Sequence, residues 1–430
     1  MTGKRTRANG EGSIFPYRNG YAAYVWVTKP DGKRGRKWVY GKTREEVHNK
    51  WIKLHQQARQ GPVATKVPTV GTYLAYWLGE VIEPNRAPLT YATYETLGRL
   101  YILPELGSKR LDRLQVRDVQ TWINRIAKTC QCCAQGKDAN RPEGKRRCCA
   151  KPIPVCCQDY PSARTVKGVR AVLRSALSYA QTEELISKNV AALVTLPPLR
   201  KRKGAAWSSE EARAFLESAR DSDDPLYAAY VLVLVLGLRK GEVLGATWDA
   251  LDWGGWDRAC HRHGEQFCEH CRDIYEVTLH VDKQLQRVHR RLLHRETKTE
   301  ESAAPLPLPD ICVTALRRQY LRQQANARTA GSAWHATNLI FTTRYGRPVE
   351  PRNFYRSWQA RCARATVRKI SVHDARRTCA SLLVDLDVHP RIAMAILRHA
   401  DFSITMEIYS QASPKATRDA LKRLGARLDR

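Results

Sequence analysis

The hydrophobic pattern of this 430-residue chain changes twice along its length, and that change most limits how the chain can fold. Residues 11–62 alternate apolar and polar side chains between glycine-containing turns, which is typical of short strands. Residues 69–198 repeat their apolar side chains at a helical spacing instead, and residues 206–430 mix both patterns. The sequence therefore predicts a multidomain α+β protein made of a small sheet domain, an all-helical domain and a mixed α/β domain.

The first domain, residues 1–62, is expected to be a three-stranded sheet packed on one helix. The strands are expected at Ile14–Tyr17, Tyr21–Val27 and Lys37–Tyr40. Thr43, followed by Glu46, has the capping-box pattern, so a helix should run from there to about Gln60. Such a sheet can enter a DNA groove with basic and aromatic side chains, and a small domain with solvated charges is the alternative. The candidate contacts are Arg18, Lys33, Arg34, Arg36 and Lys37.

The second domain, residues 69–198, is expected to be helical. Its helices are expected at Val70–Ile82, Thr90–Tyr101, Val116–Ala127 and Ser162–Glu184. Gly61–Pro68 looks like a linker before it, and a proline-rich, basic linker follows it. Candidate phosphate contacts are Arg117, Lys167, Arg170 and Arg174 on the helices and Arg200, Lys201, Arg202 and Lys203 in the second linker.

The third domain, residues 206–430, combines strands with helices. It contains a helix starting at Ser208 and an almost unbroken apolar run at Tyr227–Leu236. Strands are expected at Ile274–Val281 and Arg290–Leu293, and further helices at Pro309–Ala325, Val372–Leu386, Pro390–Arg398, Ser403–Tyr409 and, with an amphipathic pattern, Ser413–Arg430.

The charge of the chain favours a nucleic-acid partner. It carries 73 Lys and Arg against 42 Asp and Glu, a formal net charge of +31. Such an excess repels itself unless a polyanion is nearby, and DNA or RNA supplies one. No apolar stretch is long enough to span a membrane and the basic, polar N-terminus lacks a signal-peptide core, so we expect a cytoplasmic, nucleoid-associated protein.

Several residues in the third domain have the chemistry for cleaving a phosphodiester without a metal. That reaction needs a nucleophile, cations that hold the charge of the phosphorane, and an acid for the leaving oxygen. Arg239 follows the apolar run, and Glu242 three residues later can orient it. His373 and Arg376 share a helix face, and Tyr409 is a candidate nucleophile. Two further candidates are Lys298, expected at the tip of a hairpin, and His399.

These elements, in this order and spacing, resemble the tyrosine recombinases, the phage integrase family. The resemblance is carried by Gly237–Glu242, Lys298 before a proline-rich strand, His373–Arg376, Leu397–His399 and Tyr409. It implies an arm-type DNA-binding domain at residues 1–62, a core-binding, SAM-like domain at 69–198 and a catalytic domain at 206–430. It also implies that Arg239 and Arg376 clamp the scissile phosphate, and that neither ATP nor a catalytic metal takes part.

The remaining catalytic roles also come from the resemblance. It implies that Lys298 is the general acid and that His373 and His399 assist proton transfer. Tyr409 would attack and form a 3′-phosphotyrosyl bond, which a 5′-hydroxyl of the partner strand then reverses. The implied protein is the integrase of a phage or integrative element. It would perform integration and excision as a homotetramer on DNA, at core and arm sites, and could use a directionality factor or a host DNA-bending protein.

Two clusters among the 13 cysteines depart from the family pattern. An insertion at residues 254–273 contains Cys260, His263, Cys268 and Cys271, a ligand set suited to tetrahedral zinc. An insertion at residues 130–157 contains seven cysteines, enough for one structural zinc with three thiols left over. Free thiols remain the alternative in both. The seven are Cys130, Cys132, Cys133, Cys148, Cys149, Cys156 and Cys157.

Two other functions remain open from sequence alone. One is a nicking and closing enzyme similar to type IB topoisomerases, which uses the same phosphotyrosine chemistry without arm sites or a tetramer. The other is a non-catalytic, zinc-containing DNA-binding protein, in which the cysteine clusters are the main feature.

Overall fold

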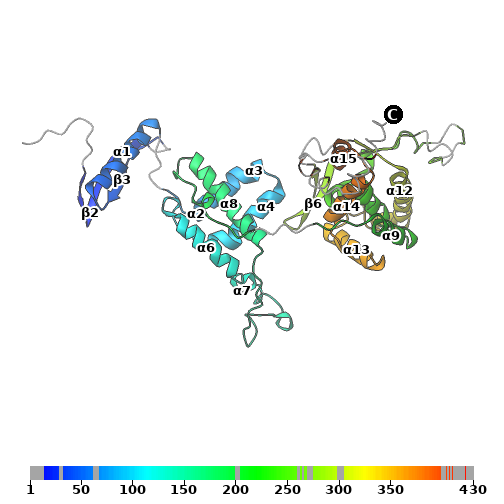
Figure 1. Ribbon diagram of the computed structural model, residues 1–430, viewed down its shortest axis with the longest axis horizontal. Helices are drawn as coiled ribbons and strands as arrows, with labels where there is room; N and C mark the ends of the chain where they lie inside the picture. The colour runs from blue at the N-terminus through cyan, green and yellow to red at the C-terminus, as the bar shows by residue number, and fades with distance from the viewer. Residues whose placement is uncertain are drawn as a thin grey trace, which may run out of the picture. The chain divides into compact units, whose positions relative to one another are not determined.

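The computed structural model describes most of the chain. The described residues are 14–28, 32–61, 67–198, 204–258, 262–263, 266–268, 275–297 and 305–398, with Ser403, Met406, Tyr409 and Lys422. They divide into two compact units, residues 1–200 and 201–430. In the first unit the strands and α1 (blue in Figure 1) and the helices that follow them have apolar cores of their own. Within these residues no helix combines the length and the apolar character that crossing a bilayer requires.

The N-terminal part of the first unit has the expected sheet and helix. Strands β1 (Phe15–Tyr17), β2 (Gly20–Thr28) and β3 (Arg34–Gly41) pair antiparallel in that order, and α1 spans Arg44–Gln60. The Thr43 hydroxyl caps α1 by accepting a hydrogen bond from the Glu46 backbone N–H at 3.2 Å. One face of the sheet packs its apolar side chains on α1, burying Val25, Val27 and Trp51 among others. The other face is left to solvent.

The rest of the first unit is a helical bundle, as expected. Its elements are α2 (Val70–Tyr76), η1 (Trp77–Ile82), α3 (Glu83–Asn85), α4 (Pro88–Leu97), η2 (Gly98–Ile102), α5 (Leu103–Leu106), η3 (Leu111–Arg113), α6 (Val116–Lys128), α8 (Ala163–Thr182) and η5 (Val190–Ala192). Trp77 and Trp122 lie fully buried in its core. The cysteine-rich insertion between α6 and α8 contains only the short helices α7 (Gln131–Ala134) and η4 (Glu143–Lys145).

The second unit surrounds one buried helix. The apolar run forms α10 (Tyr227–Val235), which is buried on all sides and contacts α9, α11, α12 and α14. The other helices are α9 (Ser209–Asp221), α11 (Lys240–Gly245), η6 (Trp248–Ala250), α12 (Asp310–Ala330), η9 (Gly331–Ala333), α13 (Pro351–Arg364), α14 (Val372–Asp385) and α15 (Pro390–Leu397). A sheet of order β4-β5-β8 joins Leu251–Asp252, Thr278–His280 and Pro305–Pro307.

The hairpin in this unit differs from the expected one. Strand β6 (Lys283–Val288), which the sequence did not predict, pairs antiparallel with β7 (Arg291–Glu296). The turn lies at His289 and Arg290, both with positive φ. The sequence predicted Lys298 at the tip of a hairpin between Arg290–Leu293 and the Pro305–Pro309 segment. Among the described residues β7 pairs with β6 and β8 pairs with β5, so these two segments do not form that hairpin. Lys298 itself belongs to the segment between β7 and β8, outside the described residues.

A buried ion pair ties α13 to the loop after α9. The Arg361 guanidinium, 2% exposed, donates to Asp224 Oδ2 from Nε at 3.0 Å and from Nη2 at 2.5 Å. We expect Asp224→Ala to lower the free energy of unfolding by about 3 kcal/mol, because an unpaired buried charge remains. Denaturant titration measures this loss. Asp221→Ala, which removes an exposed partner of Arg220, is the matched control and should change stability by less than about 1 kcal/mol; equal losses would contradict the prediction.

Candidate active site

Two buried arginines from different helices meet at the end of α10. The Arg376 guanidinium on α14 is 4% exposed and donates to the Gly237 carbonyl oxygen at 2.6 Å and to the Leu397 carbonyl oxygen. Arg398, which ends α15, is 3% exposed and adopts left-handed backbone angles with φ of 50°. The ends of α10, α14 and α15 thus bring two desolvated cations together.

A single carboxylate connects Arg239 to Arg398. Glu242 on α11 accepts from Arg239 Nη1 at 2.6 Å through one oxygen, and from Arg398 Nη2 at 2.5 Å through the other. The second oxygen also accepts from the Arg239 backbone N–H at 2.8 Å, which caps α11. The Arg239 side chain stays 42% exposed, so it can reach a ligand while Glu242 fixes its orientation.

The cations in this cluster outnumber the anions. Burial, together with repulsion from Arg239, lowers the pKa of Arg376 to about 9. Burial also lowers the pKa of Arg398, with Glu242 opposing that shift. Arg398 Nε and Nη1 are buried without a hydrogen-bond partner among the described residues. Since buried charges and donors are costly when unpaired, the cluster favours an incoming anion with several acceptor oxygens.

Gly237 lets these helices approach each other. It has a φ of +62°, and a Cβ built there would lie 2.6 Å from Leu397 Cδ2 and 3.5 Å from Arg376 Cγ. Only glycine combines that backbone conformation with that close packing. The glycine at the start of the Gly237–Glu242 motif is therefore required by its positive φ and by the close approach of Leu397, while its carbonyl oxygen accepts from the Arg376 guanidinium.

Tyr409 is half-buried and its hydroxyl is already paired. It donates a hydrogen bond of 2.6 Å to the Val388 carbonyl oxygen, in the loop between α14 and α15. Burial raises the pKa of the Tyr409 phenol above its usual value. Within the part of the chain that the structure describes, no recorded hydrogen bond joins Tyr409 to the arginine cluster. Both the bond and the burial favour the protonated phenol.

The other predicted catalytic residues are only partly described. His373 lies on the first turn of α14 with an exposed side chain, one turn before the buried Arg376. Lys298 and His399 fall outside the described residues. Arg398 was not among the residues predicted from sequence. Its position between Leu397 and His399, inside the motif, could have indicated that Arg398 belongs to the site.

The open face of the N-terminal sheet gathers aromatic and basic side chains. On β3, Arg34, Arg36, Trp38 and Tyr40 alternate to this face, and they pair across with Thr28, Trp26, Tyr24 and Ala22 of β2. The Arg36 guanidinium lies 4.8 Å from the Trp26 ring centroid and 5.3 Å from that of Tyr24. Trp26 is 50% exposed. Lys37 alternates to the opposite face, so it does not share this surface with Arg34 and Arg36.

The helical candidates for phosphate contacts lie mostly on one helix. Lys167, Arg170 and Arg174 follow one another at spacings of three and four on α8, with Lys167 and Arg174 exposed. Arg170 is only partly exposed and donates to the Ala192 carbonyl oxygen at 3.0 Å. Arg117 is exposed on α6. The candidates Arg200–Lys203 lie outside the described residues.

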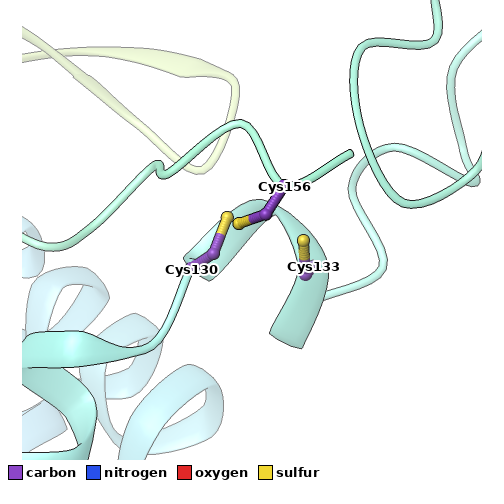
Figure 2. A group of neighbouring side chains, drawn as sticks. All are labelled: Cys130, Cys133 and Cys156. Atoms are coloured by element: carbon purple, nitrogen blue, oxygen red, sulfur yellow. The ribbon is translucent and has the colours of Figure 1, made fainter. Parts of the chain in front are cut away.

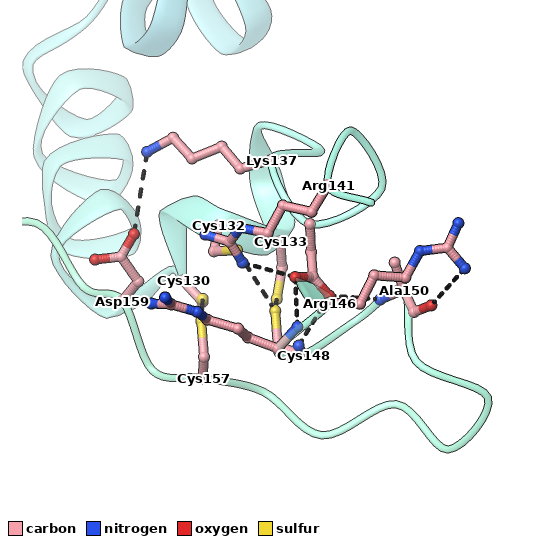
Figure 3. Close-up of polar contacts among 12 residues, drawn as sticks. Cys130, Cys132, Cys133, Lys137, Arg141, Arg146, Cys148, Ala150, Cys157 and Asp159 are labelled. Atoms are coloured by element: carbon pink, nitrogen blue, oxygen red, sulfur yellow. Dashed lines mark hydrogen bonds and ion pairs between the residues drawn. The ribbon is translucent and has the colours of Figure 1, made fainter. Parts of the chain in front are cut away.

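Both cysteine clusters contain neighbouring ligand atoms. In the second unit, Cys268 Sγ lies 3.2 Å from His263 Nδ1, while Cys260 and Cys271 fall outside the described residues. In the insertion of the first unit all seven cysteines are described, and their sulfurs form overlapping groups of three. Figure 2 draws one of these groups, and Figure 3 draws polar contacts in the same insertion. The described cysteines form no disulfide.

The fold and the arginine cluster define the tyrosine recombinases, and comparison with known families agrees. Residues 207–416 match the model of the phage integrase family, and residues 69–127 match that of the phage integrase N-terminal SAM-like domain. The chain belongs to the phage integrase family of tyrosine recombinases, which are site-specific DNA recombinases.

Individual relatives span nearly the whole chain. The chain is 25% identical over 405 residues to a "Tyrosine recombinase XerC-like" protein of Caldanaerobacter subterraneus subsp. tengcongensis, covering 92% of each. It is 26% identical over 448 residues to an integrase of Saccharopolyspora erythraea, covering 95% of this chain and 94% of that one. In fold it is similar to the Tn1549 transposon integrase in complex with transposon right-end DNA, with a TM-score of 0.58, 17% identity, and coverage of 83% of this chain and 99% of that chain.

Proposed function

We propose that this chain cuts and rejoins DNA at specific sites through a covalent 3′-phosphotyrosyl bond to Tyr409. The observation that supports this most is the cluster of Arg239, Arg376 and Arg398 around the single carboxylate of Glu242. A scissile phosphate would supply the missing negative charge and accept from the unpaired Arg398 donors. The pentacoordinate phosphorane carries more charge than the ground state, so the same cations would stabilise it further.

The proposed reaction needs only side chains of this chain. Tyr409 passes its proton toward His373 or His399, its oxygen attacks the phosphorus, and the bond to the 5′ oxygen breaks. Lys298 gives that leaving oxygen a proton, and His373 and His399 hydrogen-bond the phosphate and assist proton transfer. Arg239 and Arg376 hold the phosphate throughout. The 5′-hydroxyl of a partner strand then attacks the phosphotyrosyl bond, which conserves its energy without ATP.

A suicide substrate tests this proposal directly. A duplex nicked near the cleavage site loses its short 5′-hydroxyl fragment, so the covalent complex accumulates and is seen by denaturing gel electrophoresis. A second assay measures recombination between two DNA sites, which a topoisomerase-like nicking and closing enzyme would not perform. Absence of a covalent complex would overturn the chemistry, whereas a complex without recombination would favour the topoisomerase-like function.

As an integrase of a phage or integrative element, the chain would integrate and excise DNA on the nucleoid. Strand exchange between two duplexes uses four strand cleavages, so we propose a homotetramer on DNA. Sizing on a paired-site substrate tests it, since a complex that stayed monomeric would contradict it. A directionality factor or a host DNA-bending protein would favour either integration or excision. Adding such a protein to the recombination assay should then change the ratio of excision to integration.

The open sheet face is the proposed surface for arm-type DNA. Arg36, held beside Trp26 and Tyr24, would contact a phosphate while the exposed aromatic rings contact the groove. We expect Arg36→Ala to reduce the slope of log K against log salt by about 0.9. Fluorescence anisotropy with arm-site DNA measures the slope. Lys53→Ala removes the same charge from the exposed surface of α1, which covers the opposite face, and should leave the slope unchanged; equal effects would argue against this face.

We also propose that both cysteine clusters hold structural zinc. The contact between Cys268 and His263 supports the set Cys260, His263, Cys268 and Cys271 for one ion. Cys268→Ser should then remove one zinc per chain in native mass spectrometry, and an unchanged count would exclude this ion.

A further inference from the structure

The cysteine-rich insertion at residues 130–157 has almost nothing apolar to hold it together. Its buried apolar side chains are Cys130, Cys132 and Cys148. Ile153 and Val155, its large aliphatic residues, are 79% and 62% exposed. A segment of this size cannot fold on so small a core, so cross-links or metal ions must stabilise it.

The sulfur atoms lie at distances that suit thiolates on shared metal ions. Cys148 Sγ is 3.6 Å from Cys132 Sγ. A zinc–sulfur bond of about 2.3 Å makes the edge of a tetrahedron about 3.8 Å, close to this distance. Cys130 Sγ is 3.7 Å from Cys157 Sγ and Cys133 Sγ is 3.6 Å from Cys148 Sγ, and these two contacts bring neighbouring groups of thiols together. A disulfide would need a separation of about 2.05 Å. The spacing therefore favours metal ligation over disulfide bonds.

The seven thiols divide into two groups of three and one cysteine between them. Cys130, Cys133 and Cys156, drawn in Figure 2, form the first triad, with sulfurs within 4.8 Å of one another. Cys132, Cys148 and Cys157 form the second triad by the same measure. Cys149 forms a third such group with Cys133 of the first triad and Cys148 of the second. It therefore lies beside both triads.

We propose that the insertion holds two zinc ions, with each triad binding one ion and the Cys149 thiolate bridging the two. Two tetrahedral ions have eight ligand positions, and seven thiolates fill all of them when one is shared. A single ion would leave a whole triad of neighbouring thiols without a cation. In the second triad those would include Cys132 and Cys148, which are 1% and 0% exposed.

The surroundings of the sulfurs support a cluster of this charge. Seven thiolates and two divalent ions carry a net charge of about −3, which nearby cations and N–H donors must offset. Arg141 Nη1 donates to Cys132 Sγ at 3.5 Å, and the Gln158 backbone N–H donates to Cys156 Sγ at 3.3 Å. Lys137, Arg146 and Arg147 lie in the same insertion, and Lys137 and Arg146 are among the residues drawn in Figure 3.

Asp138 fixes the loop that supplies the bridging cysteine. Its carboxylate is fully buried and accepts from the backbone N–H groups of Arg147 at 2.7 Å, Cys148 at 2.8 Å and Ala150 at 3.1 Å. Arg141 completes the set with a hydrogen bond of 2.6 Å. These bonds hold the backbone on both sides of Cys149, so its thiol is positioned by the fold.

Native mass spectrometry of the full chain counts the ions. The inference rests on the structural zinc proposed above and not on recombination, so no DNA is used and a failure of strand transfer leaves it unaffected. Serine at Cys130, Cys133 and Cys156 should remove one zinc relative to wild type, and serine at all seven positions should remove two. Cys362→Ala, a buried cysteine in the second unit, is the control and should keep the full count. A seven-serine chain that loses one ion or none would overturn the proposal.

Cadmium-113 NMR of the wild-type chain tests the bridge even where a variant fails to fold. Two ions that share a thiolate should give a pair of signals split by cadmium–cadmium coupling, and Cys149→Ser should abolish that splitting. Absence of a coupled pair in the wild type would overturn the binuclear centre. A splitting that survives in Cys149→Ser would overturn the assignment of the bridge to Cys149.

Discussion

Replacing Tyr409 with phenylalanine is expected to abolish covalent trapping of DNA and to lower strand cleavage by at least about 10⁴-fold. The change removes the one oxygen that the proposed mechanism bonds to phosphorus and leaves the rest of the side chain in place. It also removes the hydrogen bond to the Val388 carbonyl oxygen, which is a small loss for a half-buried group. The measurement is the yield of covalent complex on a nicked suicide substrate.

DNA binding provides the internal control for this variant. Tyr409→Phe should bind core-site DNA with unchanged affinity, because the arginine cluster is intact. Tyr355→Phe, at an exposed tyrosine on α13, should trap DNA like the wild type. If Tyr409→Phe still formed the covalent complex, another residue would be the nucleophile and the proposed mechanism would fail.

Replacing Glu242 with glutamine is expected to damage both stability and catalysis. Glu242 is the only recorded carboxylate partner of the fully buried Arg398 side chain among the described residues. Removing its charge leaves that guanidinium uncompensated, which should lower the free energy of unfolding by about 3 kcal/mol. Arg239 also loses its orienting partner, so cleavage should fall by about 10²-fold or more. Denaturant titration and suicide-substrate rates measure the two effects.

Stabilisation by a bound anion distinguishes the loss of the Glu242 charge from a simple loss of packing. A bound phosphate analogue such as vanadate or sulfate should stabilise Glu242→Gln more than wild type, because it can replace the lost negative charge. Glu217→Gln, at an exposed glutamate on α9, should change neither stability nor cleavage. Wild-type stability in Glu242→Gln would show that Arg398 does not need the carboxylate.

The sequence predicted the elements whose apolar spacing is regular. The sheet of the first unit, the cap of α1 by Thr43, and the helices α6, α8 and α14 all occur where they were expected. Strand β6 was missed because only Leu285 and Val288 of its six residues are buried. Helix α13 was missed because one of its buried positions is Arg361, which a hydrophobic pattern cannot include. Arg361 can be buried because it pairs with Asp224, which lies far from it in the sequence.

The sequence indicated which residues belong to the candidate site but not which of them contact one another. Motif order indicated Arg239, Arg376 and Tyr409, and spacing of three residues indicated that Glu242 orients Arg239. No local pattern shows that Glu242 also binds Arg398, since 156 residues separate them. In the insertion, the sequence gives the number of thiols but not which of them meet, because loop closure decides that.

The hydrogen bond from Tyr409 to Val388 has a consequence for the safety of the genome that carries such an enzyme. A phenol whose proton is engaged by a carbonyl oxygen, and whose pKa is raised by burial, is a weak nucleophile. If Tyr409 is the nucleophile, as proposed, the free protein would therefore be latent toward the phosphates that it contacts. In the proposed mechanism, cutting would become feasible only once a correctly docked duplex places a phosphate among the arginines, which would link chemical reactivity to recognition of the site.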